Sequence, residues 1–158
     1  MRETSVISTT TVWKMRPFGE FSEGKEWFIG LLKKHNFTDI LDTDAISRFY
    51  RWDVEATSPE GIRYAFELKN RSFPSTTFND AAVNYDKYEK LMDCPYKAVL
   101  VMFWPDCFIC IDVKSCPPDN DITRDCAKTT RFRDHTRGDN KMARWYIQDR
   151  KVFDYDQV

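Results

Sequence analysis

Apolar and polar side chains alternate along two neighbouring segments of the chain, residues 49–57 and 62–69. The residues between them, Ser-Pro-Glu-Gly at 58–61, are typical of a turn. Because successive side chains on a strand point to opposite faces, the pattern predicts an antiparallel hairpin. The face predicted to be apolar carries Tyr50, Trp52, Val54, Ala56, Ile62, Tyr64, Phe66 and Leu68. The opposite face carries Phe49, Arg51, Asp53, Glu55, Arg63, Ala65, Glu67 and Lys69.

The rest of the chain predicts helices and strands around this hairpin. Apolar residues with helical spacing predict a helix over about 22–36, and a cap at Asn79 or Asp80 predicts a second helix that ends near Met92. The apolar runs 99–104 and 108–113 predict buried strands, and residues 142–155 return to a strand-like pattern after the irregular segment 114–140. The order predicts a mixed α/β fold, with an N-terminal extension at 1–20 and a single domain at 21–158.

Composition narrows the class of protein without naming it. The chain has 158 residues, 42% of them apolar, which is enough for one domain with a core. The 24 basic and 25 acidic residues leave a net charge of −1, which excludes a polybasic tail protein but allows a local basic face. The longest apolar stretch, 98–104, is far shorter than the roughly 20 residues of a helical membrane span. We therefore expect no membrane association, and a cytoplasmic location, in the host cytoplasm if the gene is viral.

The polar face of the hairpin carries the candidate chemistry. If the two strands pair symmetrically about residue 60, Asp53 lies opposite Glu67, with Cβ atoms about 4.5–5.5 Å apart. Two carboxylates at this distance repel each other unless a cation relieves the repulsion, and a hard divalent ion such as Mg²⁺ suits oxygen ligands. Lys69, on the same face, could orient a water molecule or stabilise charge on a phosphate. Two alternatives stay open: Glu55 as the ligand in place of Asp53, and an ordinary solvated face of charged residues.

The motif has a counterpart in a known group of enzymes. Asp53, thirteen intervening residues and then Glu67-Leu68-Lys69 resemble the signature of the PD-(D/E)xK nuclease superfamily, which includes type II restriction enzymes and archaeal Holliday-junction resolvases. The resemblance covers about residues 22–113 and is greatest to small resolvase-like or phage-encoded members. It implies a restriction-endonuclease-like core of helix, strand meander, helix and strand. The chain departs from the family pattern at Trp52, where the signature has proline.

The resemblance also implies a metal site and a reaction. Asp53 and Glu67 would bind Mg²⁺, or Mn²⁺ in its place, with the backbone carbonyl of Leu68 assisting. Lys69 would be the catalytic lysine. The implied reaction is endonucleolytic hydrolysis of DNA that leaves 5′-phosphate ends.

Two further positions follow from the same resemblance. Members often add an acidic residue from the first helix, for which Glu26 is the candidate here and Glu23 the alternative. Many also place a polar residue on the helix after the motif, and Lys87 matches that position, with a solvated helix lysine as the alternative.

A nuclease needs basic residues that contact phosphates. The residues predicted to bind nucleic acid are Arg51, Arg71, Arg131, Arg133 and Lys141. Duplex or branched DNA is the expected partner, although the sequence does not separate DNA from RNA, and a homodimer is compatible with cutting two strands. The alternatives are a catalytically inactive nuclease-fold module for DNA binding or assembly, and an unrelated α/β binding protein.

Overall fold

The computed structural model describes residues 16–19, 21–47, 50–123 and 141–158. The helices and strands have the mixed α/β composition that the sequence predicts. In chain order they are α1 (Phe21–Lys34), β1 (Thr38–Asp42), the 3₁₀ turn η2 (Thr43–Ala45), β2 (Val54–Thr57), β3 (Arg63–Asn70), β4 (Asp80–Asn84), α2 (Tyr85–Met92), β5 (Lys97–Phe103), β6 (Phe108–Asp112), β7 (Asn120–Thr123), β8 (Lys141–Tyr146) and the 3₁₀ turn η4 (Ile147–Asp149).

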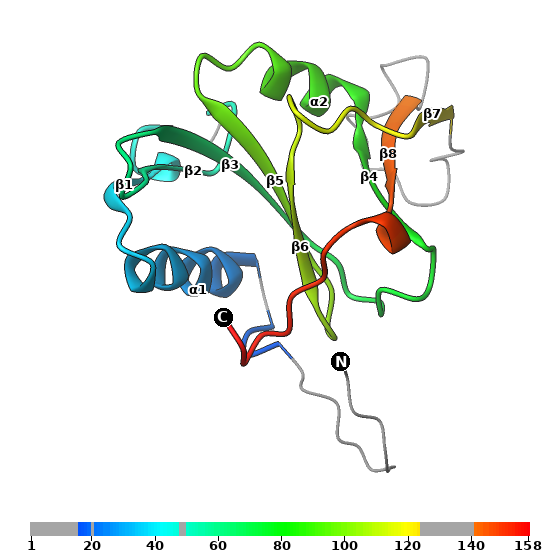
Figure 1. Cartoon of the computed structure of the whole chain (residues 1–158), viewed down its shortest axis with the longest axis horizontal. Coiled ribbons are helices and arrows are strands. Elements are labelled where there is room, and N and C mark those ends of the chain that lie inside the picture. Colours follow the sequence, from blue (N-terminus) through cyan, green and yellow to red (C-terminus); the bar gives the residue numbers. More distant parts are fainter. Residues whose placement is uncertain (1–15, 20, 48–49, 124–140) are drawn as a thin grey trace.

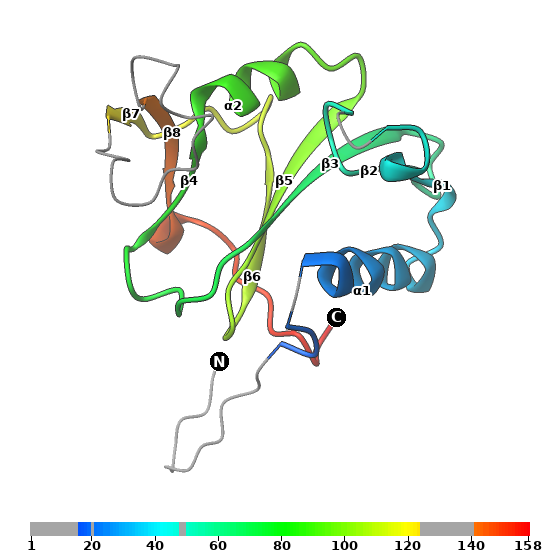
Figure 2. The ribbon, with the colours of Figure 1, turned by 180° about the vertical axis from the view of Figure 1, so that it is seen from behind.

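The strands form two sheets. A five-stranded sheet has the order β1-β2-β3-β5-β6, in which only the β3–β5 pair is parallel. The crossover that makes this pair parallel contains β4 and α2, and β4 joins a separate antiparallel sheet in the order β4-β8-β7. Figures 1 and 2 show α1 on one side of the five-stranded sheet, with α2 and the smaller sheet on the other. No helix in the part of the chain that the structure describes is long and apolar enough to cross a membrane.

The first helix forms and ends for local reasons. Phe28 and Leu32, one turn apart, are buried against the sheet, so the apolar stripe predicted from the sequence faces the core. Asn36 adopts a left-handed conformation with φ of 65°, which few residue types tolerate as well as asparagine or glycine. The Phe37 N–H then donates to the Leu32 carbonyl at 2.9 Å, and the chain turns into β1.

The predicted hairpin register is confirmed. Val54 pairs with Phe66 and Glu55 with Ala65, so the strands are symmetric about residue 60. The turn closes with a hydrogen bond from the Ser58 N–H to the Ile62 carbonyl at 2.8 Å. Gly61 has φ of 87°, a conformation that favours glycine.

Both faces of the hairpin are buried. The face that carries Phe66 and Leu68 packs in one core cluster with α1. The opposite face carries Ala65, which belongs to a second cluster that includes Leu91 of α2 and Trp145 of β8. The face of β3 that carries Glu67 therefore lies beneath α2 and the smaller sheet. The alternative that this face is an ordinary solvated surface of charged residues is wrong, because Glu67 is buried.

The prediction of one helix from residue 79 or 80 to residue 92 is wrong in its first half. Residues 80–84 form β4, which pairs antiparallel with β8, and the helix begins only at Tyr85. Instead of capping a helix, Asn79 has φ of 59°. Asp80 and the alanines that follow suit a helix start locally, but the partner strand lies about sixty residues further along the chain, beyond any local pattern.

The other strand predictions are correct in place but not in length. Residues 50–53 are not in a strand, so Trp52 packs with Ala65 instead of sharing the face of Val54. The strand expected over 142–155 ends at Tyr146, with one isolated bridge between Phe108 and Phe153. β1 and β7 were not predicted. Within the predicted N-terminal extension, Phe18 is buried with its ring centroid 5.2 Å from that of Phe103.

Candidate active site

Asp53 lies immediately before the first residue of β2, and its backbone is held from two sides. Its N–H donates to the Phe66 carbonyl of β3 at 2.9 Å, which continues the hairpin ladder by one residue. Its carbonyl accepts hydrogen bonds from the N–H and Oγ1 of Thr43, at 3.1 and 2.9 Å. Thr43 is buried in η2, so the turn after β1 and the neighbouring strand together fix the backbone of Asp53.

The Asp53 side chain points to β3. Its Oδ2 accepts a hydrogen bond from the Leu68 N–H at 2.8 Å, at a point where β2 no longer supplies a backbone partner. Burial raises the pKa of this carboxyl, against the opposing effects of the Leu68 N–H and of the positive charges of Lys25, Lys69 and Lys87. Three cations thus act on one carboxylate at the end of a strand.

Glu67 lies beside Asp53, at the next position of the hairpin register, and is almost fully buried. Its Oε2 lies 3.4 Å from the ammonium of Lys69, and its Oε1 lies 3.6 Å from that of Lys87. The second distance is too long for a hydrogen bond, and Oε1 has no hydrogen-bond partner among the described residues. A buried carboxylate oxygen without a hydrogen bond is costly and calls for a further positively charged or hydrogen-bonding partner.

The electrostatics at Glu67 agree with this geometry. Burial raises the pKa of the Glu67 carboxyl most, and the negative charge of Asp53 raises it further. Lys69 and Lys87 oppose the shift without cancelling it. The chain has therefore placed two mutually repelling carboxylates in a largely buried position, with two partly exposed lysines beside them.

The structure adds one residue that the sequence reading missed. Lys25 of α1 is only 4% exposed, and its ammonium lies 3.0 Å from Asp42 and 2.6 Å from Asp44. A signal was present in the sequence, because Lys25 lies three residues before Phe28 and seven before Leu32, on the buried stripe of the helix. A lysine at such a position needs anionic partners inside the fold.

Glu55 was the alternative ligand to Asp53, and the structure gives it other partners. Its Oε2 accepts hydrogen bonds from Trp52 Nε1 at 2.7 Å and from the Tyr50 hydroxyl at 3.2 Å. Its Oε1 pairs with Arg63 at 3.1 Å. Both oxygens are thus occupied by the protein, which favours Asp53 as the partner of Glu67.

The remaining predicted site residues are dispersed. Glu26 is exposed on α1, and Glu23 accepts a hydrogen bond from the Gly19 N–H at 2.8 Å. Leu68 turns its side chain into the cluster on the α1 side, while its N–H serves Asp53. Of the five predicted nucleic-acid-binding residues, Arg131 and Arg133 lie outside the described residues.

The other three basic residues have different surroundings. Arg71 donates from its guanidinium to the Ala82 carbonyl at 2.9 Å and so ties the end of β3 to β4. Arg51 is exposed next to Trp52. Lys141 is exposed at the start of β8, with its ammonium 4.0 Å from the centroid of the Tyr85 ring on α2.

The chemistry of the donors suits a hard divalent cation, although the site is small. Asp53 and Glu67 supply carboxylate oxygens, the ligand type that Mg²⁺ prefers, and Glu67 Oε1 has no hydrogen bond to lose. Among the described residues, no group of three or more Asp, Glu, His or Cys side chains could hold a metal. Mg²⁺ commonly keeps several water ligands and uses only one or two carboxylates, so two are compatible with it.

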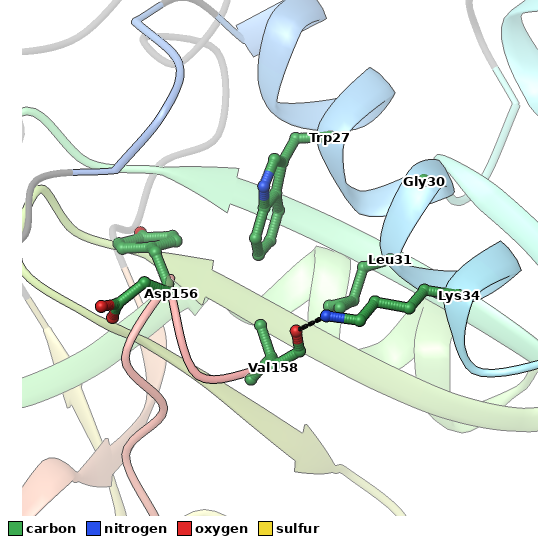
Figure 3. A pocket seen from close by; sticks show the side chains of 7 residues that line it. Trp27, Gly30, Leu31, Lys34, Asp156 and Val158 are labelled. Carbon is green, nitrogen blue, oxygen red and sulfur yellow. Dashed lines mark hydrogen bonds between the residues drawn. The ribbon is translucent and has the colours of Figure 1, made fainter.

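A cavity elsewhere on the molecule shares no residue with this cluster. It measures about 420 Å³ and is lined by Trp27, Gly30, Leu31, Lys34, Tyr155, Asp156 and Val158. Figure 3 shows α1 on one side of it and the C-terminal segment on the other, with the Lys34 ammonium bonded to the Val158 carbonyl. Its two charged side chains have opposite signs, and they do not repeat the paired carboxylates of the hairpin.

Comparisons with known proteins do not show which family this chain belongs to. No family model matches the sequence, and no curated protein matches it. Among solved structures, the chain is similar to a Holliday junction resolvase from the archaeal hyperthermophile Archaeoglobus fulgidus. The identity is 16% and the TM-score 0.46, over 59% of this chain and 72% of that chain.

Proposed function

We propose that this protein is a metal-dependent DNA endonuclease of the PD-(D/E)xK type, which hydrolyses phosphodiester bonds at the Asp53–Glu67 cluster. The observation that carries the proposal is a buried carboxylate, Glu67, beside the partly buried carboxylate of Asp53, with Lys69 and Lys87 next to Glu67. A buried structural carboxylate would be fully hydrogen-bonded, as Glu55 is, whereas Glu67 Oε1 is not.

Asp53 and Glu67 would hold Mg²⁺, or Mn²⁺ in its place, and the Leu68 carbonyl between Glu67 and Lys69 would be a further ligand. When bound, the metal would supply a water molecule of lowered pKa and would polarise the scissile phosphate. Glu26 stays a prediction for a third carboxylate. Unchanged metal affinity in a Glu26→Gln variant would remove it from the site.

Lys69 and Lys87 would act on the attacking water and on the phosphate. Lys69 is about one-third exposed, so its ammonium can contact Glu67 and still reach a molecule that arrives from solvent. It would orient the attacking water and stabilise the negative charge that develops on the phosphate. Lys87 approaches Glu67 from α2 and would bind a phosphate oxygen. Because both ammoniums point at a carboxylate, they are already positioned before substrate binds.

The DNA would approach from the side where these lysines are exposed. Lys141 lies against Tyr85 at the start of the helix that carries Lys87, and would add a further phosphate contact. Arg51 and the segment with Arg131 and Arg133 stay predictions for phosphate contacts. A homodimer, which would bring two sites to two strands, is likewise a prediction.

Nicking of supercoiled plasmid tests the proposal. Wild type should convert supercoiled to open-circular DNA with Mg²⁺ or Mn²⁺ and not with EDTA, while Glu67→Gln and Lys69→Ala should lose at least about 100-fold in rate. Glu55→Gln is the matched control, because it removes an equally buried carboxylate from the same face but should keep its activity when folded.

The outcomes separate the alternatives. No cleavage of plasmid, branched or single-stranded DNA by folded wild type would contradict the proposal and favour a DNA-binding or assembly module. Cleavage that survives in Glu67→Gln would show that the activity belongs to another site or another protein.

A further inference from the structure

We propose that Lys25 is a positioning residue for the metal ligand Asp53, and that it acts through the turn η2. The inference rests on the proposed function, because it assigns a role in holding the same site. Lys25 lies on α1, far in sequence from the hairpin, and the metal-binding motif does not include it.

Lys25 pairs with two aspartates at the turn η2. Its ammonium lies 3.0 Å from Asp42 Oδ1, at the end of β1, and 2.6 Å from Asp44 Oδ2, inside η2. Asp42 Oδ1 also accepts a hydrogen bond from the Asp44 N–H at 3.0 Å, so the two carboxylates and the ammonium are connected to one another. Because Lys25 is buried and both aspartates are about half exposed, the lysine holds the turn against α1 from inside the protein.

Thr43 connects the turn η2 to Asp53. Thr43 lies between the two aspartates and is 1% exposed. Its Oγ1 lies 2.5 Å from the Trp52 carbonyl and 2.9 Å from the Asp53 carbonyl, and its N–H donates to the Asp53 carbonyl at 3.1 Å. The residue that holds the backbone of Asp53 therefore lies between the two aspartates that pair with Lys25.

The orientation of Asp53 depends on this contact with Thr43. β2 begins at Val54, and the hydrogen bond from the Asp53 N–H to Phe66 holds only the side of its backbone that faces β3. The contact from Thr43 holds the other side. If the turn moves, the Asp53 carboxylate loses its fixed direction towards Glu67 and Leu68. Residues that orient metal ligands in this way typically change metal affinity by about 10–100-fold when they are replaced.

The experiment measures Mn²⁺ binding to the full chain by isothermal titration calorimetry, without DNA. We expect Lys25→Met, which keeps the length of the side chain and removes its charge, to raise the Mn²⁺ dissociation constant about tenfold or more. Lys25→Arg should restore most of the affinity, because a guanidinium can pair with both aspartates. The matched control is Lys97→Met, which breaks the ion pair with Asp112 on β6 and should leave affinity unchanged.

A second variant is needed because the positive charge of Lys25 also acts directly on the Asp53 carboxylate, and Lys25→Met removes that charge together with the contact to the turn. The second variant leaves the charge in place, and it keeps the test decisive if Lys25→Met does not fold. Thr43→Val removes the hydroxyl that links the turn to Asp53 and nearly preserves the volume, so it should weaken Mn²⁺ binding to a similar degree. In the Lys25→Met/Thr43→Val double variant the two losses should be less than additive, because both act on the same contact.

Two results would overturn the inference separately from the proposed function. One such result is that Glu67→Gln abolishes Mn²⁺ binding while Lys25→Met or Thr43→Val binds with wild-type affinity. This result would support the metal site and contradict the positioning role of Lys25. A lower melting temperature with unchanged affinity would mean that Lys25 only docks the helix. Wild type that binds no Mn²⁺ would overturn both proposals together.

Discussion

Glu55 and Glu67 lie on the same face of the β2–β3 hairpin and are almost equally buried, with 5% and 3% of their surface exposed. They differ in their partners. Glu55 accepts hydrogen bonds from Trp52 and Tyr50 and pairs with Arg63, whereas one oxygen of Glu67 has no hydrogen bond among the described residues. The missing hydrogen bond at Oε1 therefore distinguishes Glu67, the candidate ligand, from Glu55, a structural carboxylate of the same residue type.

The first prediction concerns the stability of Glu67→Gln without metal. Burial and the charge of Asp53 raise the pKa of Glu67 above its ordinary 4.5, so the folded protein holds this proton more tightly than the unfolded chain does. The free energy of unfolding of wild type should therefore fall as the pH rises from about 4.5 through the folded-state pKa. Glutamine does not ionise, so in EDTA at pH 7 the variant should be more stable by on the order of 1 kcal/mol, or roughly 2–4 °C.

Thermal unfolding by circular dichroism between pH 4 and pH 8 checks this prediction. The advantage of Glu67→Gln should become small near pH 4, where the carboxyl is protonated in the folded protein and mostly protonated in the unfolded chain. A variant less stable than wild type at pH 7 would mean that the lysines stabilise the ionised Glu67 more than burial penalises it.

Glu55→Gln should have the opposite effect. The substitution weakens hydrogen bonds to a charged acceptor and leaves Arg63 without its carboxylate. We expect a loss of about 1–3 kcal/mol in the free energy of unfolding at pH 7, measured by urea denaturation. Equal stability of this variant and wild type would show that the Glu55 network contributes little to the fold.

At the scale of elements, the hairpin brings Asp53 to Glu67, and its turn sets the register. Gly61 has φ of 87°, and a Cβ built there meets nothing within 4 Å. Gly61→Ala should therefore cost only the backbone strain, about 1 kcal/mol in the free energy of unfolding. Because the pairing is retained, Mn²⁺ affinity should stay at the wild-type value. An altered affinity in a folded Gly61→Ala protein would show that the turn controls more than the register.

The hairpin was predictable from the sequence because its signals are local. Alternation, a turn of Ser-Pro-Glu-Gly and symmetric pairing together place Asp53 beside Glu67, and the structure has this register. β4 was not predictable in this way, because its pairing with β8 depends on residues far along the chain. Trp52 was placed on the wrong face because alternation holds only inside a strand, and β2 begins two residues later. The burial of Lys25 was predictable from the sequence, because a lysine on the apolar stripe of a helix departs from the usual pattern of exposed lysines.

At the scale of the whole molecule, the five-stranded sheet separates two core clusters, and the candidate site lies on the side covered by α2 and the smaller sheet. Each of those elements carries a lysine that the proposed function uses. Lys87 comes from α2, and Lys141 from β8 lies against Tyr85 of the same helix. In the proposed function, Lys141 would add a phosphate contact from the smaller sheet.

The prediction at this scale concerns the salt dependence of DNA binding. Lys141→Ala should weaken binding to labelled duplex DNA about equally for unrelated sequences, and should reduce the slope of log affinity against log salt by about 1. Fluorescence anisotropy in EDTA at several KCl concentrations measures both quantities. Lys97→Ala is the control on β5 and should leave the slope unchanged. A Lys141→Ala slope equal to that of wild type would remove Lys141 from the interface.

The most direct test of the central claim is a calorimetric titration of Mn²⁺ into wild type, Glu67→Gln and Glu55→Gln. Both variants lose a buried carboxylate from the same face, so the comparison separates the loss of a buried carboxylate in general from the loss of a proposed metal ligand. We predict that wild type and Glu55→Gln bind with closely similar affinity, and that Glu67→Gln loses binding by at least about tenfold. Equal affinity in all three proteins, or a larger loss in Glu55→Gln than in Glu67→Gln, would contradict the assignment of Asp53 and Glu67 as the metal ligands.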